Sequence, residues 1–102
     1  MLILALALAW QDVPKPTPGI CSDAAFYVET ISTSEELARG RYMTAEQEEA
    51  GERRKAELST LAKALTVRFG KVRASATDRQ VFPSLTAVQM EALARACLAL
   101  PK

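Results

Sequence analysis

The chain has 102 residues and a formal net charge of +1, from 13 basic and 12 acidic residues. A near-neutral chain lacks the basic face that binds nucleic acid or an anionic membrane, so we expect no nucleic-acid partner. It contains no histidine and only 2 cysteines. These residues cannot supply the roughly four ligands of a zinc site, and histidine-based catalytic groups are excluded. We therefore predict a protein that is not an enzyme and that holds no metal or cofactor.

Residues 1–9 form an uninterrupted apolar run that ends in the small-x-small pattern Ala7-Leu8-Ala9. This pattern is typical of a signal-peptidase site, and cleavage there would leave Trp10 as the first residue. The run is too short to span a bilayer, which needs roughly 20 apolar residues, so we expect no stable membrane span after processing. We predict a signal peptide and a periplasmic or secreted protein. The alternatives are a buried N-terminal element of a cytoplasmic protein and an interfacial anchor.

Residues 10–20 contain prolines at alternating positions, each of which holds the preceding residue extended. We predict a stiff proline-rich spacer there and a helical domain over 21–102. The first helix is expected to begin with Ser22 as its N-cap and to end near Gly40. Its middle is rich in β-branched and hydroxylated residues, which are poor helix formers and predict a break near Ser32.

A long helix is predicted over 44–69. Thr44 and Gln47 have the spacing of a capping box, and Gly70 can end the helix in the left-handed conformation. The first half is almost entirely polar, so we expect the helix to pack at its C-terminal end and to project at its N-terminal end. Gly51 lies in that polar half and predicts a kink or a close contact. The second half carries an apolar stripe at helical spacing, namely Leu58, Leu61, Ala62, Leu65 and Phe69.

The connection 71–84 is expected to be a loop with one helical turn, from which Phe82 folds back onto the core. The last helix is predicted over 86–100, with Thr86 and Gln89 as a second capping box. Short connections and long amphipathic stripes together predict an all-α fold, a small three-helix up-down domain. The apolar stripe of the last helix comprises Met90, Leu93, Ala94, Cys97 and Leu100.

The two cysteines lie near opposite ends of the predicted domain. Cys21 stands at the entrance of the first helix, and Cys97 lies on the apolar face of the last one. In a small exported domain, an even pair favours a disulfide. In the chain-entropy model this bridge would stabilise the fold by roughly 4–5 kcal/mol, because it closes a long loop. In a cytoplasmic protein both residues would be free thiols.

The polar half of the long helix is the candidate partner surface, because packing does not account for it. Glu49 and Arg53 stand four positions apart, the spacing of a solvated ion pair, so a plain solvated face is the simpler alternative. We predict that this half-helix and the 41–43 connection contact another protein. The candidate contact residues are Tyr42, Met43, Glu46, Glu49, Arg53 and Arg54.

The two capped helix starts read MTAEQ at 43–47 and LTAVQ at 85–89. They resemble the paired LTxxQ motifs of small periplasmic stress proteins, the Spy-like and CpxP-like chaperones. The resemblance implies an exported, all-helical protein that binds non-native or partner proteins through a helical surface. Met replaces Leu in the first motif. The only role carried over is that of starting a helix, for Thr44, Gln47, Thr86 and Gln89.

These observations together favour an exported helical protein-interaction module with a chaperone-like or inhibitor-like role. The alternative is an intracellular or phage-type adaptor or structural subunit. Such a protein would use residues 1–9 as part of its core or as an oligomer interface. Self-association into a homo-oligomer is open in either case.

Overall fold

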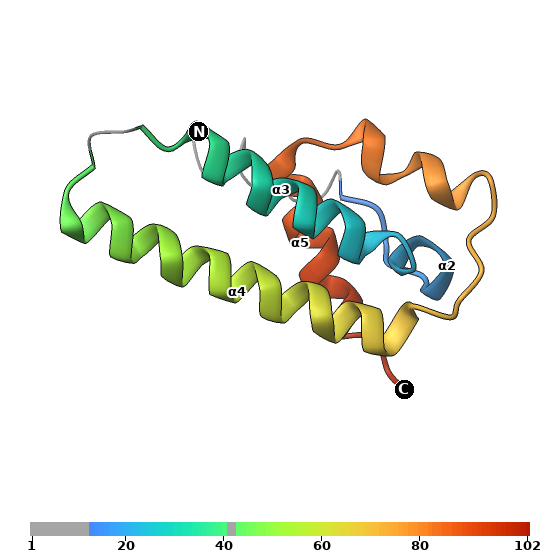
Figure 1. Cartoon of the computed structure of the whole chain (residues 1–102). Coiled ribbons are helices and arrows are strands. Elements are labelled where there is room, and N and C mark those ends of the chain that lie inside the picture. The colour runs from blue at the N-terminus through green and yellow to red at the C-terminus, as the bar shows by residue number, and fades with distance from the viewer. Residues whose placement is uncertain (1–12, 41–42) are drawn as a thin grey trace, which may run out of the picture.

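The computed structural model describes residues 13–40 and 43–102 and shows a helical hairpin crossed by a third helix (Figure 1). No strand occurs in this part of the chain, which confirms the all-α class. None of its helices combines the length and the apolarity needed to cross a bilayer. The signal peptide predicted over 1–9 lies outside the described residues, as does Tyr42.

Three main helices build the described part of the fold. Helix α3 spans Ala24–Ala38, α4 spans Ala45–Phe69 and α5 spans Ala87–Leu98. The first two lie side by side and antiparallel, and α5 runs across them (Figure 1). Both predicted capping boxes are present: the Thr44 hydroxyl accepts from the backbone of Gln47, and Thr86 and Gln89 repeat the arrangement.

The hydrophobic core lies where all three helices meet. The stripe predicted for the long helix is buried in full, and α3 contributes Ala24, Val28 and Ile31. Phe82 folds back as predicted and is completely buried, with its ring stacked on that of Tyr27 at 5.1 Å between centroids. Burial of such large side chains is the main stabilising contribution to a small helical domain. The α5 residues in this core are Leu93, Ala94 and Cys97.

Short helices cover one end of the core. Residues Pro18–Cys21 form α2, and the connection before α5 contains the 3-10 helices Asp78–Gln80 (η1) and Phe82–Ser84 (η2). The predicted spacer is therefore too long, because its last residues are helical and Ile20 is buried. Thr17 caps α2 by accepting from the Ile20 backbone, and proline is favourable at the first helical position.

The predicted disulfide is present and joins α2 to α5. Cys21 and Cys97 are both buried, with their Cα atoms 5.8 Å apart. Ser22 does not cap α3 as expected. It follows α2, and its hydroxyl donates to the Gly19 carbonyl at 2.7 Å.

The up-down detail of the predicted fold differs from the structure, because α5 crosses the hairpin steeply (Figure 1). The connection 70–86 is long enough to release α5 from an antiparallel return. Arg68 of α4 then holds the end of α5 by donating to the Leu98 and Pro101 carbonyls, at 2.9 and 3.0 Å. A cation is favourable at these unpaired helix-terminal carbonyls.

Two local predictions about helix ends and breaks are wrong. Helix α3 continues through Ser32, because packing against α4 outweighs the low helix propensity of its residues. Gly70 ends α4 as predicted, but in the right-handed conformation, with φ −61°. Its N–H donates to the Thr66 carbonyl at 2.9 Å and adds one more helical bond.

Candidate functional site: the polar hairpin end

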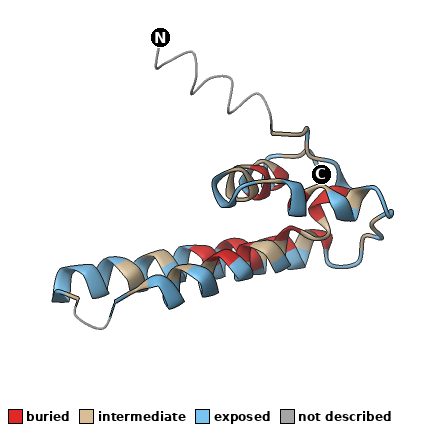
Figure 2. Cartoon of the chain, turned by 90° about the horizontal axis from the view of Figure 1, so that it is seen from above, coloured by how far each residue is buried: buried red, intermediate tan, exposed pale blue. Residues whose placement is uncertain are grey.

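The hydrophobic core occupies only one end of the α3–α4 hairpin. Ile31 is the last buried residue of α3, and Leu58 is the first buried residue of α4. The helices continue beyond these residues without burying any described side chain (Figure 2). We call residues 32–40 and 43–57 the polar hairpin end, and residues 24–31 and 58–69 the core end. Hydrophobic burial therefore does not explain why the two helices extend into the polar hairpin end.

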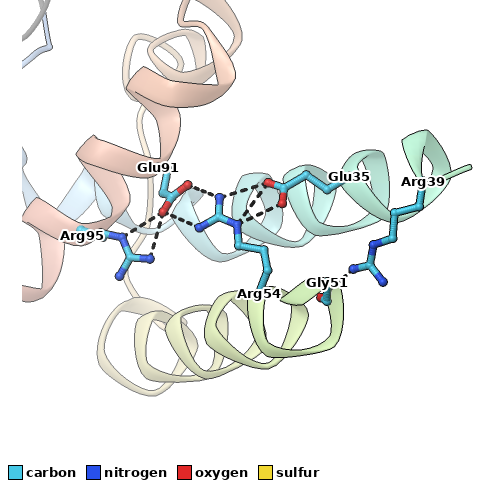
Figure 3. A network of polar contacts seen from close by, with 6 residues as sticks. All are labelled: Glu35, Arg39, Gly51, Arg54, Glu91 and Arg95. Carbon is cyan, nitrogen blue, oxygen red and sulfur yellow. Dashed lines mark hydrogen bonds and ion pairs between the residues drawn. The ribbon is translucent and has the colours of Figure 1, made fainter. Parts of the chain in front are cut away.

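Arg54 joins all three main helices at the boundary between the two ends. Its Nε and Nη2 atoms donate to both carboxylate oxygens of Glu35 on α3, each at 3.0 Å. Its Nη1 donates to Glu91 on α5 at 2.9 Å, and its Nη2 also bonds that carboxylate (Figure 3). A planar guanidinium can hold two carboxylates bidentately in this way, and such charge-assisted bonds are among the strongest in proteins.

Glu91 is the most shielded member of this network, with 20% of its side chain exposed. It also accepts from Arg95 on its own helix, at 2.9 Å. The hydrogen bonds from Arg54, supported by those from Arg95, lower the pKa of Glu91 to about 2. Conversely, hydrogen bonds first to Glu91 and then to Glu35 raise the pKa of Arg54 above its ordinary value. Both Arg54 and Glu91 therefore stay charged at neutral pH.

Arg39 forms a second link, closer to the tip of the hairpin. Its Nη2 donates to the Gly51 carbonyl at 2.7 Å (Figure 3). Its Nη1 lies 3.5 Å from a carboxylate oxygen of Glu52. The guanidinium lies so close that a Cβ atom at residue 51 would come within 2.7 Å of it. The predicted close contact at Gly51 is thus confirmed, and glycine there admits the side chain that joins the two helices.

The remaining ion pairs of the polar hairpin end are exposed. Lys55 pairs with Glu36 at 3.2 Å, and the predicted pair of Glu49 and Arg53 is present at 3.7 Å. Exposed pairs of this kind each contribute roughly 0–1 kcal/mol, because water competes for both charges. The two arginine links described above, rather than these pairs, fix the separation of the helices.

The structure divides the predicted contact residues into two groups. Glu46, Glu49 and Arg53 are exposed along α4, and Met43 is half-buried just before it. Arg54, in contrast, points inward and uses its guanidinium within the chain. Four residues that complete the links were not predicted, namely Glu35, Arg39, Glu91 and Arg95. The contacts that Arg39 and Arg54 make between helices join residues far apart in the chain and follow no helical period. Arg95, in contrast, meets Glu91 at the i, i+4 spacing, which is a local signal in the sequence.

Outside the polar hairpin end, the described residues offer few candidate sites. Residues 13–40 and 43–102 contain no cluster of acidic or cysteine side chains that could hold a metal ion. The groove between α4 and α5 is open to solvent and is lined mainly by apolar atoms, with Arg53 and Arg95 beside it. No protein-family model, curated protein or solved structure matches this chain. The polar hairpin end is therefore the candidate functional site of the described residues.

Proposed function

We propose that this protein is an exported interaction module that binds another protein through its polar hairpin end. The observation that carries the proposal is the continuation of α3 and α4 beyond the hydrophobic core. Two arginine links hold this extension in place without burying its outer side. A charged extension that is held by two arginine links and adds nothing to the core is suited to recognition, because its side chains are already positioned for a partner.

The Cys21–Cys97 disulfide supports the exported part of the proposal. Disulfides persist in oxidising compartments and are rare in the reducing cytosol. This one closes a loop of 76 positions in sequence and connects the start of the described domain to its last helix. A chain of this size gains a large share of its stability from such a bridge.

The charge of the outer side of α4 indicates the kind of partner. Its exposed acidic residues outnumber the basic ones near the helix start. Glu49 is paired with Arg53 and Glu52 with Arg39, so Glu46 and Glu48 are the ones that form no ion pair within the described residues. A partner with a basic surface would complement this side. A charged surface also favours an inhibitor-like role toward a folded partner, since a chaperone-like role would draw on exposed apolar surface. The acidic residues concerned are Glu46, Glu48, Glu49 and Glu52.

The first experiment measures the intact mass of natively expressed protein without reductant, before and after thiol alkylation. A chain that begins near Trp10 and has no alkylatable thiol would support export. A full-length chain with two alkylatable thiols would contradict it and would favour the intracellular adaptor.

The second experiment places a photo-reactive amino acid at Glu49 and, as a matched control, at exposed Arg79 of η1. We expect a specific adduct in the natural host from residue 49 only, and we expect it to weaken with salt because exposed charges are screened. Glu46→Lys should reduce the same adduct. Equal adduct patterns from residues 49 and 79, or none from residue 49, would contradict a partner at the polar hairpin end.

A further inference from the structure

The outer face of α3 carries a stripe of four side chains that the fold does not bury. Phe26, Thr30, Thr33 and Leu37 recur at helical spacing on the side opposite the core, where they line an open hollow. Phe26 is 65% exposed and Leu37 is 81% exposed. These two large apolar side chains stand at the ends of the stripe, about 16 Å apart along the helix axis, with the two threonines between them.

Two features prepare this stripe for contact. The Phe26 ring packs edge-on against Tyr27 at 5.1 Å between centroids, and Tyr27 in turn stacks on buried Phe82. Tyr27 therefore gives the Phe26 ring an aromatic neighbour on its own helix. The Thr30 hydroxyl donates to the Phe26 carbonyl at 2.9 Å, so removing Thr30 from water leaves no unpaired donor.

The order of apolar and hydroxyl side chains in the stripe is the same in both chain directions. Reversing the helix exchanges Phe26 with Leu37 and Thr30 with Thr33. Two such helices packed antiparallel would therefore match apolar with apolar and hydroxyl with hydroxyl, the layer pairing of an antiparallel coiled coil. A self-complementary patch of this kind fits a twofold-symmetric contact. We propose that the outer face of α3 binds the same face of a second copy of this chain, with the two α3 helices antiparallel.

The charges beside the stripe agree with this orientation. One flank carries Glu29 and Glu36, with Lys55 of α4 paired to Glu36 at 3.2 Å. Antiparallel packing about the stripe centre brings the Glu36–Lys55 pair of one copy to the level of Glu29 in the other, so that Lys55 would lie between two carboxylates. Glu29 forms no ion pair within the described residues, so it can accept this one. In a parallel pair, the same flank would instead face the uncharged side of α3.

The contact is small, and this sets its strength. Four side chains cover less than the roughly 800 Å² per partner of a standard interface, so the dimer is weak and dissociates on dilution. The antiparallel arrangement points the two polar hairpin ends in opposite directions. Each copy could then hold its own partner.

The test is sedimentation equilibrium of the disulfide-intact protein from about 1 µM to about 1 mM, a range that covers weak dimers. We expect wild type to associate and Leu37→Glu to raise the dissociation constant by about tenfold or more, because it places a carboxylate against the Phe26 ring. Val67→Glu is the matched control on α4, since Val67 is 88% exposed and lies outside the stripe. Neither variant changes a buried residue.

Cross-linking tests the orientation. A mixture of Thr30→Cys and Thr33→Cys proteins should form an intermolecular disulfide faster than either variant alone, because antiparallel packing places these positions opposite each other. The proposal is overturned if wild type stays monomeric over the whole range, or if Leu37→Glu associates as wild type does. Faster cross-linking of Thr30→Cys alone would also overturn it, by indicating a parallel pair. The proposal is also overturned if the protein stays monomeric and binds a different protein through this face.

Discussion

The two ends of the α3–α4 hairpin are stabilised by different forces. At the core end, side chains such as Leu58 and Phe69 are buried, and the Cys21–Cys97 disulfide closes the neighbouring helices. At the polar hairpin end, Arg39 and Arg54 join the same two helices through half-exposed charged contacts. Hydrophobic burial is insensitive to pH, whereas ion pairs weaken with acid and salt. Within one helix pair, the core end therefore forms a stable scaffold, and the stability of the polar hairpin end can change separately with pH and salt.

The largest effect should come from removing the disulfide. The double variant Cys21→Ala and Cys97→Ala should lower the free energy of unfolding by roughly 4–5 kcal/mol, because the unfolded chain regains the entropy that the long loop removed. Urea unfolding measured by circular dichroism checks this value. A loss below about 1 kcal/mol would mean that the core alone holds the scaffold.

A core substitution should have the next largest effect. Leu58→Ala at the first buried position of α4 should cost about 2–5 kcal/mol, through lost burial and the cavity left behind. Val67→Ala, at a highly exposed position of the same helix, should change the free energy of unfolding by less than about 0.5 kcal/mol. Similar costs at the two positions would contradict the buried stripe.

Breaking the Arg54 network should cost less but should affect a defined region. Arg54→Met leaves Glu35 and Glu91 without their shared cation, and we expect a loss of roughly 1–3 kcal/mol. The adjacent Arg53→Met is the matched control, because Arg53 forms only an exposed pair. Chemical denaturation gives both values. Equal effects would show that Arg54 behaves as an ordinary surface residue.

Acid should act on the same network. The pKa of Glu91 falls from 4.5 to about 2 in the folded chain, so its contribution is present above pH 4.5 and is lost as the pH drops toward 2. We expect the loss to be on the order of 2 kcal/mol. Urea unfolding at pH 6 and near pH 2, compared between wild type and Glu91→Gln, isolates this group. The prediction fails if both proteins lose the same stability.

The local patterns of the sequence were sufficient to predict the core end. A helical apolar stripe has one face to bury, and Leu58 to Phe69 are buried as predicted. The capping boxes at Thr44 and Thr86 depend only on residues three positions apart, and both form. The disulfide followed from an even cysteine pair in a small chain.

The polar hairpin end depends on contacts that no local pattern reports. Arg54 meets Glu35 and Glu91 across long sequence separations, and charged residues at such positions look like any solvated face. The crossing of α5 was missed because it depends on a long connection and on Arg68 holding the helix end. Helix α2 was missed because Pro18, its first residue, also suits an extended spacer.

Amide hydrogen exchange along α4 tests the difference between the two ends most directly. We predict that the amides of residues 48–57 exchange through local opening, with protection at least about 2 kcal/mol below that of residues 58–69, which should require global unfolding. Arg54→Met should widen this gap. Equal protection along the whole helix, falling together with added denaturant, would show a single cooperative unit and would contradict a separately held extension.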